Sequence, residues 1–370
     1  MDLTLVVPGG EGRTGSVSGL SPEFITGLGI SSEVKERVQD ASGAQVLAVA
    51  HGHVLDQDLF ERLWARRAES EVVLASRYLR GGGSEVSTLA SLATRLGNRA
   101  LRRALRLPCH DLASGIRLYK RSALEELGTA ALERSSPLEL LVRLHNLGFK
   151  LREVAYHDRG GRGLGRVLAE LAAGFRELPR LARMRRSPEA ADLDDIAFEA
   201  LPPWRRRRLA ERKRTIVSFL EADVPVLDVG CGSSRLIQSL SRGTGLDRDR
   251  RKLRFLRGRA RAIVGGELPR LPFRDGSFPQ IVCSDVIASL APSTPYLPEL
   301  RRVLASRGTL VLTTSAAGGT EVALRDELQK NGFAVDEVRK IRGPELVVRA
   351  VRKELDPAAH EDRRGGAGAS

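Results

Sequence analysis

The chain contains a glycine turn between two short apolar segments, and each of these segments ends in an aspartate. The first segment and the turn read Val226-Leu-Asp-Val-Gly-Cys-Gly-Ser-Ser234, and the second segment ends in Gly245-Leu-Asp247. This order predicts a strand, a tight loop, a helical segment and a second strand whose last residue faces back toward the loop. Ligands of open α/β sheets bind at the carboxyl ends of the strands. The pattern therefore predicts an α/β sheet with a ligand site beside the turn.

The residues of this turn suggest the chemical class of the ligand. Gly230 and Gly232 allow the main chain to approach a ligand where a Cβ atom would collide. Asp247 lies 19 residues after Asp228 and can accept hydrogen bonds from both hydroxyls of a ribose. We therefore predict a nucleoside-containing cofactor. The alternative is that the glycines only form a tight strand-to-helix turn.

Length and composition limit the class of protein. A chain of 370 residues with 42% hydrophobic residues suits two domains, each with its own core. Cys109, Cys231 and Cys283 show no paired spacing, which favours a reducing compartment over a disulfide framework or a zinc site. No apolar run has the length of a membrane span, and no signal peptide is recognisable. We expect a cytoplasmic protein that at most lies on a membrane surface.

Short apolar segments alternate with helical patterns along most of the chain. This alternation predicts an α/β fold in which each of two domains has a mainly parallel sheet with helices on both faces. Composition and the spacing of apolar residues divide the sequence into four regions: a first domain, a basic amphipathic helix with a linker, a second domain and a disordered polar tail. Their expected bounds are 1–163, 164–203, 204–353 and 354–370.

The second domain contains several motifs in a characteristic order. They are Val226–Ser234, Gly245–Asp247, Leu271–Phe278, Ile281–Val286 and Leu300–Leu312. With these motifs the domain resembles class I S-adenosylmethionine-dependent methyltransferases, which have a Rossmann-like fold. The resemblance implies that Asp228, Gly230 and Gly232 hold the methionine end of the cofactor. It also implies that Asp247 binds the ribose hydroxyls and that Glu267 lies near the adenine amine.

The substrate side of this domain departs from the family pattern. Ser234 replaces a common third glycine, Pro279 replaces an acid, and Ser289 replaces a histidine. Methyl transfer mainly needs a nucleophile held in line with the sulfonium and a water-poor pocket, so the chemistry requires no dedicated base. We therefore name no catalytic residue, and Asp285 is the candidate on the substrate side. The expected acceptor is a small molecule, plausibly a saccharide or a lipid-linked intermediate.

The first domain resembles glycosyltransferase family 2, in its polyprenyl-phosphate branch, and would be a truncated glycosyltransferase A-type fold. The motifs that carry this resemblance are Ser76–Gly83, Arg95–Asn98, Asp111–Tyr119 and Leu138–Val154. In that family an aspartate pair holds a divalent cation against the nucleotide diphosphate. Here His51-Gly-His53 occupies the metal position, and Val6–Gly10 replaces the acids that would read the base. We expect an inactive glycosyltransferase domain and no metal.

Two alternatives remain for the first domain. His51 and His53 can bind a softer metal through imidazole, which would keep the glycosyltransferase active, or they are plain surface histidines. Both domains can also be retained as a non-catalytic scaffold.

The same domain retains residues of the acceptor side, among them Glu139. Arg77 and Arg117, with Asp111 beside them, can form an anion site for a lipid or glycolipid, because arginine binds phosphate bidentately. The alternative is that the arginines form ion pairs with Asp111 and hold a loop.

The chain carries a formal net charge of +14, which favours polyanionic partners or simply reflects arginines on solvated faces. Leu164–Arg186 has apolar residues at helical spacing with arginines between them, and Pro179 should end or kink this helix. Such a segment can lie on an anionic membrane, or it can pack the two domains together. Nucleic acid is an unlikely partner, because only 4% of the residues are aromatic.

Overall fold

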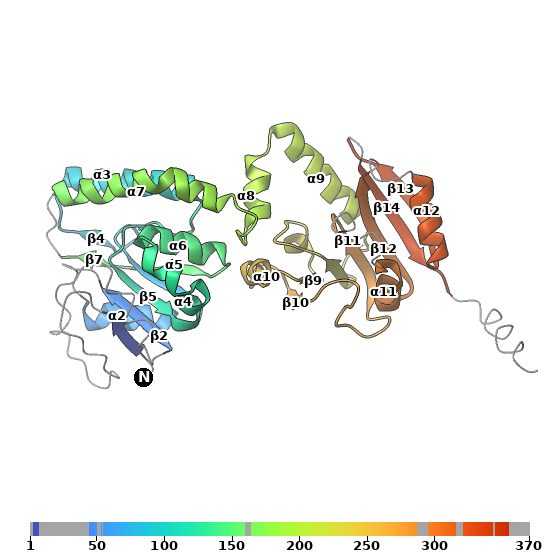
Figure 1. Cartoon of the computed structure of the whole chain (residues 1–370), viewed down its shortest axis with the longest axis horizontal. Helices are drawn as coiled ribbons and strands as arrows, with labels where there is room; N and C mark the ends of the chain where they lie inside the picture. Colours follow the sequence, from blue (N-terminus) through green and yellow to red (C-terminus); the bar gives the residue numbers. More distant parts are fainter. Residues whose placement is uncertain are drawn as a thin grey trace, which may run out of the picture. The chain divides into compact units, whose positions relative to one another are not determined.

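The computed structural model describes most of the chain as two compact units. The units are Met1–Leu193 and Asp194–Ser370, and each contains its own sheet (Figure 1). The described residues are 3–6, 44–49, 53, 55–159, 164–286, 295–315, 321–342 and 345–354. The predicted α/β class with two sheet-containing domains is confirmed. His51, Ser289 and the predicted tail from residue 355 onward lie outside the described residues.

The boundary between the units lies inside the segment predicted as a separate helix and linker. Helix α7 (Leu164–Arg185) belongs to the first unit, which ends just after Asp192. The carboxylate of Asp192 is held there by Arg185 at 2.6 Å and by His145 at 3.3 Å. The predicted linker contains helix α8 (Leu193–Ala200), because Ile196 is buried and the acids beside it have partners.

The first unit has a five-stranded sheet in the order β1-β2-β5-β3-β6. Its strands are β1 (Leu3–Val6), β2 (Gln45–Val49), β3 (Val72–Ser76), β5 (Ile116–Lys120) and β6 (Leu151–Ala155). Strand β5 runs antiparallel to both neighbours, whereas the pairs β1–β2 and β3–β6 are parallel. The sheet is therefore mixed, which corrects the expectation of mainly parallel pairing for this unit. Two further short strands, β4 (Gly83–Ser84) and β7 (His157–Asp158), form a parallel pair.

Alternating side chains of these strands pack into two apolar cores, one on each face of the sheet. Val46 and Ala48 of β2 face one core, and Leu47 and Val49 face the other. Helix α2 (Gln57–Arg66) covers the second core, with Leu59 and Leu63 buried. The helices on the first core are α3 (Thr88–Leu105), α4 (Arg121–Leu127), α5 (Thr129–Arg134), α6 (Pro137–Asn146) and α7. Helices on both faces were predicted correctly.

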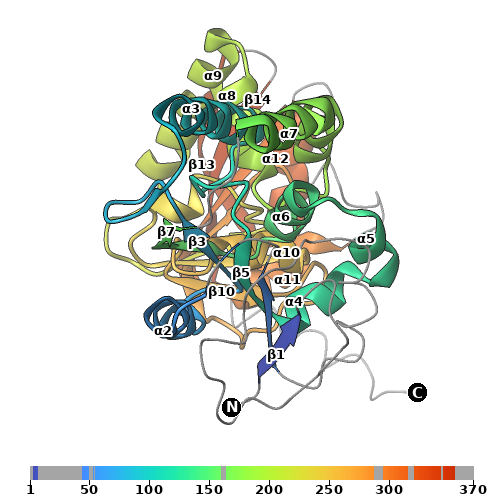
Figure 2. The same cartoon turned by 90° about the vertical axis from the view of Figure 1, so that its left-hand side faces the viewer.

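Helices α3 and α7 lie side by side (Figures 1 and 2). Their approach is close because glycines lie at the contact: a Cβ atom on Gly97 would be 2.5 Å from Leu171, and one on Gly174 would be 3.0 Å from Leu101. Pro179, expected to end or kink the helix, lies within α7, which continues to Arg185. None of the helices in the described part of the chain is long and apolar enough to cross a membrane.

The second unit has a seven-stranded sheet in the order β10-β9-β8-β11-β12-β14-β13. Its strands are β8 (Val226–Val229), β9 (Gly243–Asp247), β10 (Ala262–Gly265), β11 (Phe278–Cys283), β12 (Leu304–Ser315), β13 (Phe333–Lys340) and β14 (Glu345–Arg352). The first five strands in this order are parallel, and β14 runs against β12 and β13. The mainly parallel sheet predicted here is confirmed. The strand order reverses between β8 and β11, which is where open α/β sheets bind ligands.

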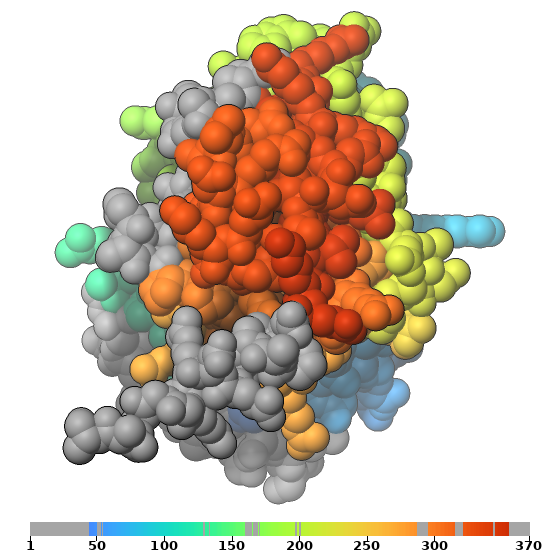
Figure 3. All heavy atoms as spheres, turned by 90° about the vertical axis from the view of Figure 1, so that its right-hand side faces the viewer, coloured from blue at the N-terminus to red at the C-terminus, as the bar shows by residue number. Residues whose placement is uncertain are grey.

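Helices cover both faces of this sheet. Helix α9 (Pro203–Ser218) packs on one face through Ile216. Helices α11 (Tyr296–Val303) and α12 (Glu321–Lys330) pack on the other, and α10 (Arg250–Leu256) follows β9. Figure 3 shows the side of this unit where α12, β13 and β14, drawn in orange to red, form the surface.

The helical segment predicted after the glycine turn is absent from the described stretch 230–242, which contains only the short 3₁₀ turn η2 (Ile237–Ser239). The described stretch 266–277, between β10 and β11, likewise contains no helix. The second stretch contains Pro269 and Pro272, which cannot lie inside a helix without the loss of hydrogen bonds.

Candidate functional site

The glycine turn joins the carboxyl end of β8 to the neighbouring strand β9. The backbone N–H groups of Gly230 and Cys231 both donate to the carbonyl oxygen of Leu246, at 2.7 and 3.0 Å. Gly230 has a φ of 71°, and a Cβ atom there would lie 2.2 Å from Val286. A larger residue is therefore excluded both by the backbone and by the neighbouring side chain.

Asp247, at the end of β9, faces the glycine turn as the sequence predicts. Its Oδ2 atom accepts a hydrogen bond from the N–H of Gly232 at 2.8 Å, and Oδ1 accepts one from the N–H of Asp249 at 2.8 Å. A carboxylate offers about four acceptor positions, so this side chain still has room for two hydroxyl donors. Binding of ribose by Asp247 remains a prediction that this geometry allows.

Asp228 lies almost completely buried beneath the turn, with 2% of its surface exposed. Its Oδ2 atom has no hydrogen-bond partner among the described residues. Burial, and to a lesser degree the charge of Asp247, raises the pKa of Asp228 to about 7. A cationic ligand beside these two carboxylates would offset their repulsion, and S-adenosylmethionine carries a positive sulfonium and a positive ammonium. The buried unpartnered oxygen and the glycine turn therefore fit the predicted cofactor.

Glu267 follows β10 and lies close to the same end of the sheet. The N–H of the preceding Gly266 donates to the carbonyl oxygen of Asp247 at 3.1 Å. The carboxylate of Glu267 is largely exposed, with Arg248 at 3.6 Å. It is thus available to a ligand, and its contact with adenine stays a prediction.

Asp285, the candidate on the substrate side, follows β11 with a φ of 60°, which is unusual for a residue other than glycine. Its N–H donates to the hydroxyl of Thr313 at 3.0 Å, and its carboxylate pairs with Arg212 of α9 at 2.6 Å. Arg212 also pairs with the buried Glu345, and Arg208 contacts the same carboxylate. Burial lowers the pKa of Arg212, but Asp285 and Glu345 outweigh it and raise that pKa.

Sequence reasoning missed these two arginines and the acids of α8. Arg208 and Arg212 lie four residues apart, which places them on one face of α9. Asp194 was counted as part of a linker, yet its Oδ2 atom accepts hydrogen bonds from the N–H and the hydroxyl of Ser233, at 2.7 and 2.9 Å. The acidic first turn of α8 was the one signal in the sequence.

In the first unit, the three residues predicted as an anion site are buried and have partners inside the protein. Arg77 and Asp111 form a bidentate ion pair, with both distances 2.7 Å. This is the ion pair that the sequence left open as the alternative. Arg117 does not join it and donates instead to the carbonyl oxygens of Leu112, Ser114 and Pro137.

His53, a candidate metal ligand, is buried rather than on the surface, and its Nδ1 atom lies 3.5 Å from Asp158. No group of three or more histidine, cysteine or acidic side chains that could hold a metal occurs in the described part of the chain. All three cysteines are free and buried, and burial raises the pKa of Cys109 and Cys283 to about 12.

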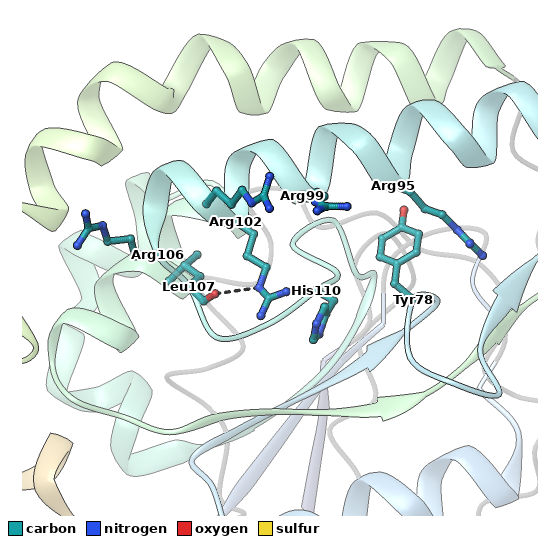
Figure 4. Close-up of a pocket in the computed structure, with 8 residues that line it drawn as sticks. Tyr78, Arg95, Arg99, Arg102, Arg106, Leu107 and His110 are labelled. Carbon is teal, nitrogen blue, oxygen red and sulfur yellow. Dashed lines mark hydrogen bonds between the residues drawn. The ribbon is translucent and has the colours of Figure 1, made fainter. Parts of the chain in front are cut away.

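A cavity of about 680 Å³ lies beside α3 (Figure 4). Tyr78 and His110 line it together with five arginines of α3 and the loop after it, and no carboxylate is among the described residues on its wall. The arginines are Arg95, Arg99, Arg102, Arg103 and Arg106. A wall that carries five arginines suits a multiply charged anion.

Between this cavity and the start of α3, the helix has exposed leucines. Leu89, Leu92 and Leu96 are 73%, 54% and 58% exposed, and their spacing places them on one face. Phe175 of the adjacent α7 is also exposed. Apolar and cationic side chains therefore lie next to each other on the α3 surface.

Part of the second unit matches a known family. Residues 227–312, from β8 to β12, match the family model "Methyltransferase domain". The match includes the glycine turn, Asp247, Glu267 and Asp285. No curated protein matches the chain in sequence.

Solved structures similar to this chain include several methyltransferases. A TehB-like SAM-dependent methyltransferase from Corynebacterium glutamicum is 22% identical and covers 41% of this chain and 95% of its own, with a TM-score of 0.34. A putative methyltransferase in complex with the Trm112 activator of Haloferax volcanii is 16% identical, covering 41% and 96%, with a TM-score of 0.35. Magnesium protoporphyrin IX methyltransferase from Synechocystis PCC 6803, with bound SAH, is 17% identical, covering 40% and 85%, with a TM-score of 0.34.

Proposed function

We propose that this protein transfers a methyl group from S-adenosylmethionine to a small-molecule acceptor, since its C-terminal unit carries a class I S-adenosylmethionine-dependent methyltransferase domain. The observation that carries the proposal is the carboxylate of Asp247 at the glycine turn, 2.8 Å from the N–H of Gly232. A side chain that can bind hydroxyls lies there beside glycine main chain, close to the point where the strand order of the sheet reverses.

We assign each part of the cofactor to residues around the turn. Asp228, Gly230 and Gly232 would hold its methionine end, Asp247 its ribose and Glu267 its adenine. The bound cofactor supplies a methyl group made electrophilic by a sulfonium. The carboxylates of Asp228 and Asp247 stabilise a cation beside them, and the glycine turn brings the main chain close to it.

On the acceptor side, Asp285 is the side chain that we assign to substrate contact. Arg212 holds its carboxylate, and Thr313 holds its backbone N–H, so the side chain is kept in one place despite its exposure. Such a group can accept a hydrogen bond from a hydroxyl or amine nucleophile. We propose a saccharide or a lipid-linked intermediate as the acceptor class.

Calorimetry with S-adenosylhomocysteine tests this function. The full chain should bind one equivalent, and Asp247→Ala should weaken binding at least tenfold, because two charge-assisted hydrogen bonds to ribose are lost. Asp336→Ala, which removes an acid from β13 of the same unit, is the matched control and should bind like the wild type. A folded wild-type protein that binds no S-adenosylhomocysteine would refute the proposal.

For the first unit we propose docking on an anionic lipid surface rather than glycosyl transfer. The exposed leucines of α3 can enter the headgroup layer while Arg99 and Arg103 meet lipid phosphates. This places the docking surface on α3, beside the predicted segment Leu164–Arg186. The scarcity of aromatic residues argues against nucleic acid on the same surface.

Sedimentation with vesicles tests the docking. The protein should bind phosphatidylglycerol vesicles and not phosphatidylcholine vesicles, and both Leu92→Ser and the double change Arg99→Glu with Arg103→Glu should weaken binding. Glu85→Lys, at an exposed position before α3, is a control that should not reduce binding. Equal binding to both vesicles, or preferential binding to RNA, would contradict this role.

We also propose that the first unit turns over no sugar nucleotide. Histidines stand where acids are expected at the metal position, and one of them, His53, is buried beside Asp158. Incubation with sugar nucleotides and manganese or zinc should release no nucleotide. Metal-dependent release that is lost in His53→Ala would favour the active glycosyltransferase instead.

A further inference from the structure

The carboxylate of Asp194 lies directly over the glycine turn of the methyltransferase domain. Its Oδ2 atom accepts hydrogen bonds from both the N–H and the hydroxyl of Ser233. A Cβ atom placed on Gly232 would lie 2.6 Å from that same oxygen and 3.7 Å from the ammonium of Lys252. Gly232 has no side chain, and the carboxylate of Asp194 fills the space that a side chain would need.

The two consecutive backbone donors of the turn are both occupied by carboxylates. Gly232 donates to Asp247, and Ser233 donates to Asp194. Lys252 adds a cation 3.8 Å from the Asp194 carboxylate. A backbone N–H, a hydroxyl and an ammonium around one position form a binding site for a carboxylate. In this structure Asp194 is the carboxylate that fills it.

Helix α8 is held at this position by further contacts. Asp195 pairs with Arg235 at 2.7 Å, and Glu199 pairs with the same guanidinium at 3.2 Å. That guanidinium also lies 4.3 Å from the ring centroid of Phe198. The presence of Asp194 over the turn is therefore a property of the whole helix rather than of one side-chain rotamer.

We propose that Asp194 is an internal competitor for the carboxylate-binding position of the glycine turn, so that the α-carboxylate of the cofactor binds only after Asp194 has left Ser233. This inference rests on the proposed methyltransferase function. Two carboxylates cannot share one backbone N–H in a partly buried site without strong repulsion. The contact thus lowers cofactor affinity and makes occupancy of the site depend on where α8 lies.

The test compares two ligands that differ only at their amino-acid end. S-adenosylhomocysteine has the α-carboxylate, whereas 5′-methylthioadenosine retains adenosine and sulfur and lacks the amino-acid end. Calorimetry is performed with the full chain, with Asp194→Asn, and with Asp336→Asn as the control, which removes an acid of β13 that pairs with Arg349 and is not among the contacts that hold α8.

Asp194→Asn should bind S-adenosylhomocysteine about tenfold tighter than the wild type, as expected when one charge-assisted competing contact is lost. Its affinity for 5′-methylthioadenosine, and both affinities of Asp336→Asn, should stay within about twofold of the wild type.

Unchanged or weaker binding of S-adenosylhomocysteine by Asp194→Asn, in a wild type that does bind it, would overturn the inference and leave the methyltransferase function intact. Weaker binding would mean that Asp194 holds the cofactor, for example at its ammonium. Equal tightening for both ligands would also overturn it, because the effect would not concern the carboxylate. If neither the wild type nor any folded variant binds either ligand, the proposed function itself fails, and the inference fails with it.

Discussion

Asp228 lies one residue before the end of β8 and Asp247 lies at the end of the adjacent parallel strand β9, and the charge of Asp247 adds to burial in raising the pKa of Asp228 to about 7. Without ligand, the protein thus keeps two carboxylates close together under a glycine turn. One of them is deeply buried and has an unpartnered oxygen. This arrangement costs stability in the free protein and favours the binding of a cation.

The first prediction concerns pH. The folded state binds a proton on Asp228 up to about pH 7, whereas the unfolded chain releases it near 3.8, so the stability that this proton contributes is lost as the pH rises through 7. Asp228→Asn stays neutral. Its stability relative to the wild type should therefore increase by about 2 kcal/mol between pH 5.5 and pH 8. Urea unfolding of the ligand-free protein at both pH values measures this. A difference that does not change with pH would contradict it.

The second prediction compares two glycines of the second unit with similar backbone conformations. Gly230 and Gly276 have φ of 71° and 63°, but a Cβ atom would lie 2.2 Å from Val286 at the first and no closer than 3.8 Å to Ala305 at the second. Gly276→Ala should cost about 1–2 kcal/mol from the backbone alone. Gly230→Ala should cost about 3 kcal/mol or more, because Val286 must also move. Equal losses in chemical denaturation would show that the steric contact is unimportant.

The third prediction tests the buried ion pair of the first unit. Burial lowers the pKa of Arg77, but the contact with Asp111 outweighs this and raises it above the ordinary value. Asp111→Asn should destabilise the unit by about 3–5 kcal/mol, because it leaves a buried guanidinium without its main partner. Glu125→Gln removes the exposed pair with Arg121 and should cost less than about 1 kcal/mol. Urea unfolding of both variants measures these losses. Similar small losses in the free energy of unfolding would contradict the prediction.

The fourth prediction concerns the two arginines that share Glu345. Because Arg208 and Arg212 both contact this buried carboxylate, either one can satisfy it when the other is removed. Arg208→Gln and Arg212→Gln should each cost about 1 kcal/mol, and the double variant about 3 kcal/mol or more. A double-mutant cycle by urea unfolding measures the coupling. Additive losses would mean that Glu345 does not connect the two side chains.

The sequence predicts the second sheet and its turn well, because the information there is local. Each of its short apolar segments is a strand in the structure, and the acid at the end of β9 faces the glycine turn as expected. These features depend on residues that lie next to each other in sequence or on adjacent strands. The same residues predict a nucleoside-containing cofactor, and the resemblance to methyltransferases specified it as S-adenosylmethionine.

Features that depend on distant segments were not predictable in the same way. The apolar pattern of Ile116–Lys120 contains no sign that β5 runs against its neighbours, because strand direction is set by the path of the whole chain. Asp194 reaches Ser233 across 39 residues, so its acidic neighbourhood looks like a linker. The short 3₁₀ turn after Ser234 stands where a helix was expected, because the whole segment between β8 and β9 is short.

The junction between the units has a consequence for anyone who divides this protein. Asp192 is held by Arg185 and His145 in the first unit, Asp194 is held by the glycine turn in the second, and only Leu193 separates them. A fragment cut at Pro203 would retain the complete seven-stranded sheet and discard α8. By the competition proposed above, such a fragment would bind cofactor more tightly than the full chain, and a dissociation constant measured on it would overstate the affinity of the full chain.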